Sequence, residues 1–211
     1  MGKMLTMHNH SLYLASQSSS RHDLLRLADI PFQVVLHASN EKNDASIDDF
    51  GDYVMVIAQD KMAKVVIPES ARAHKEIFVM TADTLVKTSK TNKILGKPAN
   101  QQEAQVMLEL SCKEPVEVVT AVCIEKRMWQ ENEWDVLKTK TILSRSHIEF
   151  CVPRDQRADY LAKEPAAMVA SGAAVIEGYG LVFLKSIQGS FTGVQGLPIF
   201  EVQQALKDLG F

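Results

Sequence analysis

The chain reads Leu12-Tyr13-Leu14-Ala15-Ser16-Gln17-Ser18-Ser19-Ser20-Arg21-His22-Asp23-Leu24-Leu25 close to its N-terminus. The four apolar residues that open this stretch predict a short buried strand, and the residues from Arg21 onward have the periodicity of a helix. Ser18 stands where a cap for that helix is expected. The stretch therefore predicts a strand, a turn rich in hydroxyl groups and the start of a helix.

The rest of the chain alternates strand and helix patterns. Further helices are predicted for residues 48–66, 101–110, 154–161 and 199–209. Further strands are predicted for residues 33–36, 77–81, 85–87, 116–125, 136–150 and 181–187. Residues 38–47, 88–92 and 189–198 are expected to be loops or turns, residues 127–135 to connect two long strands into an antiparallel ribbon, and residues 166–180 fit no pattern. This mixture predicts an α/β fold with a mixed sheet.

Length and charge limit the classes of function. With 211 residues the chain suits one medium domain or two small lobes that share a cleft. A net charge of −3 leaves no broad cationic face for duplex nucleic acid, so a polyanionic ligand would need local positive charge in one pocket. No apolar run reaches the roughly 18 residues of a membrane span, and the N-terminus has no secretory signal pattern. We therefore expect a cytoplasmic protein that binds neither membranes nor duplex nucleic acid.

Cysteines and histidines give no pattern for a zinc site. Cys112, Cys123 and Cys151 lack the spacing of metal ligands, and the six histidines form no HExxH motif. We expect the thiols to be buried and reduced, because two of them lie in apolar, strand-like segments. Trp129 and Trp134 flank the predicted ribbon connection, where we expect them to pack.

Two segments carry residues suited to an anion. The turn from Ser16 to Arg21 would aim backbone N–H groups and a helix N-terminus at one point, and Arg21 would add a bidentate donor. A serine cap that binds nothing is the alternative. Lys97 precedes Pro98, which restricts the lysine backbone and can hold its charge in one place. An ordinary surface lysine is the alternative there.

Acidic and basic residues elsewhere have two interpretations each. Asp83 stands between two apolar runs, where a carboxylate is costly unless it is paired, hydrogen-bonded or bound to a metal. A turn or capping aspartate is the alternative. Lys61 and Lys64 share one face of the predicted helix, and a solvated face would account for both. Glu41 lies in a polar loop and would be an exposed acid in the simplest interpretation.

Taken in order, these segments resemble the motif blocks of the Maf family. Residues 14–25 are similar to the motif LASxSPRRxELL, Ala58-Gln59-Asp60-Lys61 to A-x-x-K, Thr81-Ala82-Asp83-Thr84 to (G/A)-A-D-T, and Ile94-Leu95-Gly96-Lys97-Pro98 to ILGKP. Later blocks match at residues 107–111, 119–122, 177–180, 189–191 and 196–198. The blocks are collinear and cover roughly residues 12–205, nearly the whole chain.

The resemblance implies a fold and an activity. Maf proteins are nucleoside triphosphate pyrophosphatases, which cut an NTP or dNTP into a monophosphate and pyrophosphate. The implied fold is an elongated mixed β-sheet with flanking helices, in which two lobes surround a central cleft. We expect residues 1–211 to form one such domain, with the first 11 residues as an extension, and the resemblance also suggests a homodimer.

The resemblance also implies the site residues. Asp83 becomes the catalytic acid, as general base or as metal ligand, and Glu41 becomes a second metal ligand. The expected metal is Mg²⁺ or Mn²⁺. The following residues become triphosphate contacts: Arg21, Lys61 and Lys97, with Ser16 and Ser18 in the phosphate turn. The implied reaction is in-line attack of metal-activated water on the α-phosphorus, with Asp83 taking the proton.

Some positions depart from the family pattern. Ser19-Ser20 replaces a Pro-Arg pair in the phosphate turn, Asn40 replaces the acid before Glu41, and Val169-Ala170 replaces an aspartate and a lysine. These losses of charge leave three outcomes open: a shifted substrate, weaker binding of the triphosphate, or reduced activity.

Three positions bear on which nucleotide base the protein prefers, and they favour different bases. The three positions are Ser20, Thr84 and Glu177 in this chain. Pyrimidine-preferring family members tend to have arginine, threonine and glutamine there, in that order. Members that prefer 7-methyl-GTP tend to have tryptophan, glutamine and glutamate. An ionised Glu177 only accepts hydrogen bonds, which suits the N1–H and N2–H edge of guanine and the cationic 7-methylated ring. We therefore expect 7-methyl-GTP to be preferred to dTTP and UTP. The alternative is that Glu177 only supports the loop of Gly178 and Gly180.

Two other functions are weighed against this one. A non-catalytic nucleotide-binding regulator of cell division would not need the hydrolytic set of Asp83 and Lys97. A pyrophosphatase for inosine- or xanthosine-type triphosphates would carry a glycine-rich opening, which this chain lacks.

Overall fold

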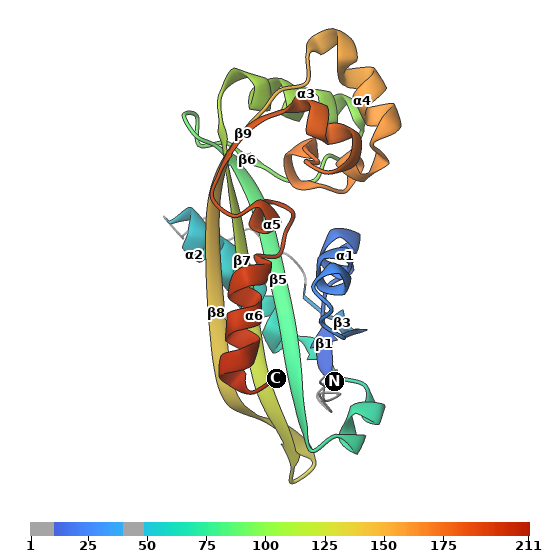
Figure 1. Cartoon of the computed structure of the whole chain (residues 1–211), viewed down its shortest axis with the longest axis vertical. Helices are drawn as coiled ribbons and strands as arrows, with labels where there is room; N and C mark the ends of the chain where they lie inside the picture. Colours follow the sequence, from blue (N-terminus) through green and yellow to red (C-terminus); the bar gives the residue numbers. More distant parts are fainter. Residues whose placement is uncertain (1–10, 40–48) are drawn as a thin grey trace, which may run out of the picture.

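Three long strands run through the molecule from one end to the other (Figure 1). They are β5 (Glu76–Thr88), β7 (Val116–Gln130) and β8 (Glu133–Phe150). The computed structural model describes residues 11–39 and 49–211, so Asn40 and Glu41 lie outside the described residues.

Shorter strands complete the sheet on both sides of this axis. They are β1 (Leu12–Leu14), β2 (Gln33–Val34), β6 (Ile94–Leu95) and β9 (Leu184–Gln188), while β3 (Leu36–His37) and β4 (Val65–Val66) form a separate pair. The order across the sheet is β2-β1-β5-β7-β8-β9, and β6 pairs with β5. β1 is parallel to β2 and β5, and the other pairs of this sheet are antiparallel. The predicted α/β fold with a mixed sheet is confirmed.

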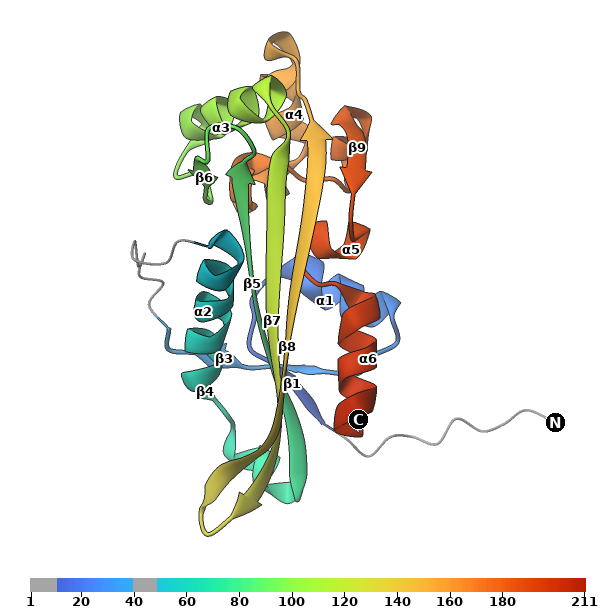
Figure 2. The ribbon, with the colours of Figure 1, turned by 90° about the vertical axis from the view of Figure 1, so that its left-hand side faces the viewer.

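Helices cover both faces of the sheet. They are α1 (Ser19–Leu27), α2 (Phe50–Ala63), α3 (Gln101–Lys113), α4 (Arg157–Lys163), α5 (Phe191–Val194) and α6 (Ile199–Leu209). α2 lies on one face of the lower part of the sheet, while α1 and α6 lie on the other (Figure 2). Since neighbouring strand residues point to opposite faces, Val79 packs with Met62 of α2, and Met80 packs with Leu206 of α6. Among the helices of the described ranges, none has the length and apolar character that a membrane span requires.

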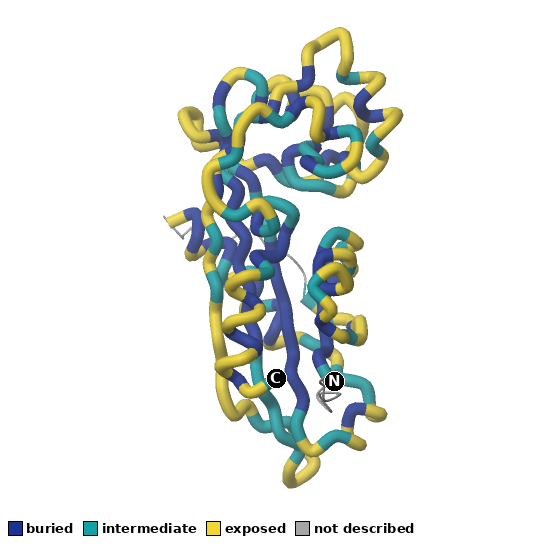
Figure 3. The backbone as a smooth tube through the Cα atoms, viewed as in Figure 1, coloured by how far each residue is buried: buried dark blue, intermediate teal, exposed yellow. Residues whose placement is uncertain are grey.

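A separate apolar core lies at the other end of the long strands. Leu108 of α3 and Tyr160 of α4 pack there against Val118 and Ile148 of the sheet. Three short 3₁₀ helices complete this part: Pro165–Met168, Ser171–Ala173 and Gly178–Phe183. β5 and the first half of β7 are buried, whereas β8 is largely exposed and the helices alternate buried and exposed residues (Figure 3). The molecule thus has two lobes on one elongated sheet.

The strand order leaves an opening on one edge of β5. β1 pairs with Phe78–Met80, and Ala15 N–H also donates to Met80 O at 2.8 Å. The chain then leaves β5 and enters the serine turn. β6 joins the same edge only from Val86 onward. Within the described ranges no strand pairs with residues 81–85 on this side. Side chains of both faces of β5 can therefore reach the same space at this opening.

The long strands correct several sequence-based boundaries. The predicted strands 77–81 and 85–87 are one strand, so Asp83 lies within a strand and not in a turn. β7 pairs with β5 residue by residue, from Glu76 to Thr88, and this ladder continues through the aspartate. The predicted connection 127–135 is also mostly strand. Only Glu131 and Asn132 form the turn, with φ of 50° and 68°, as a two-residue hairpin requires.

Helix limits and the burial of two thiols also differ from the expectations. The predicted helix 48–66 spans Phe50–Ala63, because Asp49 caps it and Val65–Val66 pairs with β3. The strand predicted for residues 181–187 begins at Leu184. Cys123 is buried as expected, but Cys112 is half-buried and Cys151 is exposed. Trp129 and Trp134 pack edge to face, with ring centroids 5.2 Å apart, which confirms the prediction for this pair.

Candidate active site

A cleft of about 570 Å³ lies at the opening on β5, between the two lobes. The serine turn before α1, the middle of β5 and the end of α2 form its lower wall, while the segment from 166 to 177 forms its upper wall. The predicted residues that line it are Ser16, Ser18, Ser20, Arg21, Lys61, Asp83, Thr84, Lys97 and Glu177. The fold therefore brings together every described residue predicted for the site.

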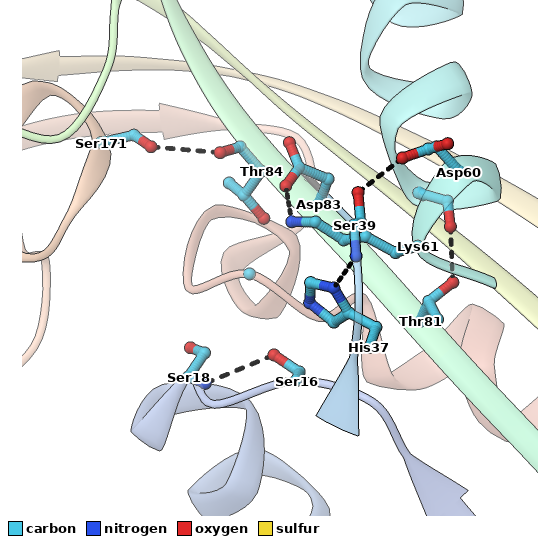
Figure 4. Close-up of polar contacts among 12 residues, drawn as sticks. Ser16, Ser18, His37, Ser39, Asp60, Lys61, Thr81, Asp83, Thr84 and Ser171 are labelled. Atoms are coloured by element: carbon cyan, nitrogen blue, oxygen red, sulfur yellow. Dashed lines mark hydrogen bonds and ion pairs between the residues drawn. The ribbon is translucent and has the colours of Figure 1, made fainter. Parts of the chain in front are cut away.

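The centre of the cleft contains a buried ion pair. Lys61 Nζ lies 2.6 Å from Asp83 Oδ1, and the two residues are only 6% and 8% exposed. α2 approaches β5 closely because Ala58 is small and because Thr81 Oγ1 donates to Ala58 O at 2.7 Å. Lys61, one helical turn after Ala58, then points along the strand to Asp83 (Figure 4). The alternative of a solvated face is wrong for Lys61, whereas Lys64 is exposed and pairs with Asp60.

Arg21 joins three separate segments at the cleft. Its Nε donates to Gly196 O at 2.8 Å, and its two other nitrogens donate to Ser16 Oγ at 2.9 Å and Thr84 Oγ1 at 3.0 Å. Gly196 has φ of 109°, a conformation that favours glycine, so its carbonyl can face the guanidinium. Thr84 Oγ1 also contacts Thr120 Oγ1 at 2.8 Å. Arg21 therefore holds the serine turn against β5 as well as placing positive charge in the cleft.

The serine turn presents the N-terminus of α1 to the cleft. Ser18 occupies the predicted N-cap position, but its side chain makes no capping hydrogen bond. Its own N–H donates instead to Ser16 Oγ at 3.3 Å, and His22 Nε2 contacts Ser16 O at 2.8 Å. The first N–H groups of a helix have no intrahelical acceptor, and Ser19 and Ser20 line the cleft. Such a terminus is suited to a phosphate group.

The upper wall is less charged than the lower one. Lys97 lines the cleft and is exposed, and within residues 11–39 and 49–211 its ammonium has no hydrogen bond or ion pair. Val169 is 67% exposed, so the position where the family resemblance places an acid is apolar surface. Ser171 Oγ donates to Thr84 O at 3.1 Å and ties this wall to β5.

Part of the cleft lining is apolar. Val118, Ile148 and Ile176 belong to the upper core and line the cleft. Glu177 and Gln195 also line it. Burial raises the pKa of Glu177 above its usual range, although hydrogen bonds from backbone amides and from Gln195 oppose the rise. Sequence reasoning missed Gln195, because nothing in a glycine-rich loop distinguishes a glutamine that faces a cleft.

Asp83 is the described carboxylate best placed to hold a divalent metal. Hard oxygen ligands suit Mg²⁺ and Mn²⁺, and Mg²⁺ commonly binds one or two carboxylates together with substrate phosphates and water. Within the described ranges, no group of three or more acidic, histidine or cysteine residues is arranged for a metal. Asp83 therefore suits a divalent metal that the phosphates of a substrate would also bind. Glu41, the other predicted ligand, lies outside the described residues.

A cleft that is lined by a buried lysine–aspartate pair and by a helix N-terminus is suited to a polyanion. The sequence profile described as Maf-like protein matches residues 11–209. A relative from Bacillus mycoides (strain KBAB4) is 33% identical over 196 residues, which are 93% of this chain and 94% of the relative. Another from Bacillus cytotoxicus is 35% identical over 196 residues, or 92% of this chain and 93% of the relative. Both are named dTTP/UTP pyrophosphatase. The chain belongs to the Maf-like protein family.

Proposed function

We propose that the protein is a nucleoside triphosphate pyrophosphatase, which hydrolyses an NTP or dNTP to the monophosphate and pyrophosphate. The observation that carries this proposal is the buried pair of Lys61 and Asp83, which lies in the same cleft as the N-terminus of α1. A carboxylate among cations suits hydrolysis of a phosphoanhydride, since it can take a proton while the cations neutralise the departing phosphates. The names of the relatives support the same reaction.

The residues of the cleft divide the work of this reaction. Asp83 accepts a proton from the water that attacks the α-phosphorus, and Lys61 holds that carboxylate in position at 2.6 Å. Lys97 and the first N–H groups of α1 neutralise charge on the β- and γ-phosphates. Mg²⁺ or Mn²⁺ at Asp83, when bound, supplies Lewis acidity and further neutralises the phosphates.

The products of the reaction test the proposal. With Mg²⁺ or Mn²⁺ and a panel of natural and modified nucleoside triphosphates, the purified protein is expected to release pyrophosphate from at least one of them. Chromatographic separation of the products measures this. Orthophosphate and a nucleoside diphosphate would contradict the proposed cleavage, and so would an absence of turnover across the panel. The second outcome would instead favour the non-catalytic nucleotide-binding regulator of cell division.

For the base, we propose 7-methyl-GTP as the preferred substrate when Glu177 is ionised. A carboxylate accepts hydrogen bonds from the N1–H and N2–H edge of guanine, and its charge attracts the cationic methylated ring. The second candidate is dTTP or UTP, which Thr84 and the names of the relatives favour. The place of Glu177 in the lining of the cleft supports a role there over one confined to supporting the loop.

A comparison of three substrates tests this preference. At a pH well above the pKa of Glu177, 7-methyl-GTP is expected to have a higher kcat/KM than dTTP and UTP, and Glu177→Gln is expected to reduce that advantage by roughly tenfold. Measuring all three substrates in both proteins gives the result. A wild-type protein that prefers dTTP or UTP at that pH would show that Thr84 is the better indicator of the base.

A further inference from the structure

Two threonine hydroxyl groups connect Arg21 to a buried carbonyl group. Thr84 and Thr120 lie opposite each other on β5 and β7, and their Oγ1 atoms are 2.8 Å apart. Thr84 Oγ1 accepts from Arg21 at 3.0 Å, and Thr120 Oγ1 donates to Gly193 O at 2.7 Å. Thr84 lines the cleft, whereas Thr120 is fully buried and outside the cleft lining. We call these four residues the hydroxyl relay.

The direction of each hydrogen bond in the relay follows from counting protons. A threonine hydroxyl has one proton and two acceptor positions. A carbonyl oxygen only accepts, so the Thr120 proton goes to Gly193 O. Thr84 must then supply the proton of the contact between the two hydroxyls. The relay therefore runs one way, from Arg21 to Gly193, and neither hydroxyl has a proton left for a ligand.

Close packing keeps Gly193 within reach of Thr120. A Cβ at Gly193 would lie 2.5 Å from Ser144 Oγ, and Ser144 is the β8 partner of Thr120. A glycine, which has no Cβ, can come this near to the sheet. The N–H of Gly193 donates to Ser190 Oγ at 3.0 Å. This end of the relay is thus anchored on the sheet and at the start of α5.

The other end of the relay meets the serine turn. Arg21 also donates to Ser16 Oγ at 2.9 Å, and the N–H of Ser18 donates to the same oxygen at 3.3 Å. Asp83 directly precedes Thr84 on β5. A relay that fixes Arg21 on Thr84 therefore also fixes the serine turn relative to the Asp83 carboxylate.

We propose that Thr120 is a positioning residue for the reaction, which acts through the relay to hold the serine turn at a fixed distance from Asp83. This inference rests on the proposed function, in which the N-terminus of α1 binds phosphates and Asp83 takes a proton. The rate of such a reaction depends strongly on how the reacting groups are placed. The relay acts on the phosphates and not on the base, so its effect is the same for every nucleoside triphosphate.

Thr120→Val tests the proposal, because valine has nearly the same shape and lacks the hydroxyl. We expect kcat for pyrophosphate release to fall by about tenfold and KM to change by less than about threefold, since the phosphate contacts remain while their placement changes. Thr120→Ser keeps the hydroxyl and should retain kcat within about threefold of wild type. Normal kcat in Thr120→Val, or equal losses of kcat in the valine and serine variants, would overturn the inference.

Thr88→Val is the matched control for a purely structural role. Thr88 is equally buried at the end of β5, outside the cleft lining, and its Oγ1 contacts Thr91 Oγ1 at 2.7 Å and accepts from the N–H of Lys93 at 2.9 Å. Its loss should lower the free energy of unfolding much as Thr120→Val does, while kcat stays within about twofold of wild type. Chemical denaturation measures both stabilities. An equal loss of kcat in Thr88→Val would assign the effect to destabilisation and overturn the inference.

Thr84→Val breaks the relay at the cleft and decides the matter if Thr120→Val does not fold. It should lower kcat by a similar factor for each nucleoside triphosphate that the wild type hydrolyses. A loss confined to pyrimidine nucleotides would show that Thr84 contacts the base, which would overturn the inference. Absence of pyrophosphate release from any nucleotide by the wild type would instead overturn the proposed function.

The double variant of Thr84→Val and Thr120→Val tests whether the two hydroxyls act as one unit. Both substitutions break the same relay, so the double variant should lose no more kcat than the more impaired single variant. A loss equal to the product of the two single losses would show independent effects and would overturn the inference.

Discussion

Asp83→Asn is expected to lower kcat by about 10²-fold or more, as expected when a general base or a metal-holding carboxylate is lost. Asparagine is nearly the same shape, and its side-chain oxygen can still accept from Lys61 Nζ, which lies 2.6 Å from Asp83 Oδ1. The fold should therefore persist while proton transfer and metal binding are lost. Pyrophosphate release under saturating substrate gives kcat, and circular dichroism confirms the fold.

A carboxylate elsewhere on the same strand provides the control. Glu76 pairs with Lys126 at the far end of β5, so Glu76→Gln changes charge on the strand without entering the cleft. Its kcat should stay within about twofold of wild type, as surface changes away from special features usually have small effects. Near-normal turnover in a folded Asp83→Asn protein would remove Asp83 from the centre of the reaction.

Lys61→Met is expected to reduce the free energy of unfolding by about 3–5 kcal/mol, as expected when one partner of a buried ion pair is removed. The remaining Asp83 carboxylate would be buried without its ammonium partner. Activity should also fall sharply, since the lysine positions that carboxylate. Chemical denaturation gives the stability, and pyrophosphate release gives the activity.

The nearby Lys64 and a double variant sharpen this test. Lys64 lies three residues further along and forms an exposed pair with Asp60, so Lys64→Met should change stability by less than about 1 kcal/mol. Combining Lys61→Met with Asp83→Leu replaces both charges by apolar groups, which can be nearly neutral. The double variant should therefore be more stable than Lys61→Met alone and remain inactive. Equal destabilisation in Lys61→Met and in the double variant would contradict a stabilising role for the Lys61–Asp83 contact.

Local sequence patterns predicted which elements exist better than where they end. The strand, serine turn and helix at residues 12–27 appear as expected, since apolar periodicity is a local property. The split of β5 at Asp83 was wrong, because the ladder to β7 and the charge of Lys61 come from distant segments. Residues 166–180 form short 3₁₀ turns, and such turns are too brief to produce a helical period.

The candidate site was predictable in composition but not in its contacts. Sequence analysis named Lys61 and Asp83 and could not show that they touch, since a lysine on a helix is more often solvated. It named Arg21 as a phosphate contact, whereas the three protein oxygens that its guanidinium meets come from segments far apart in the chain. Gln195 had no signal at all, because its place in the cleft lining depends on how α5 packs in the fold.

The central claim is that water attacks the α-phosphorus of a nucleoside triphosphate, and hydrolysis in ¹⁸O-labelled water tests it most directly. The attacking oxygen remains with the phosphorus that it attacks, so mass spectrometry of the products identifies the bond that was cut. We expect one ¹⁸O atom in the nucleoside monophosphate and none in the pyrophosphate. Label in the pyrophosphate, or labelled orthophosphate beside a nucleoside diphosphate, would contradict the account.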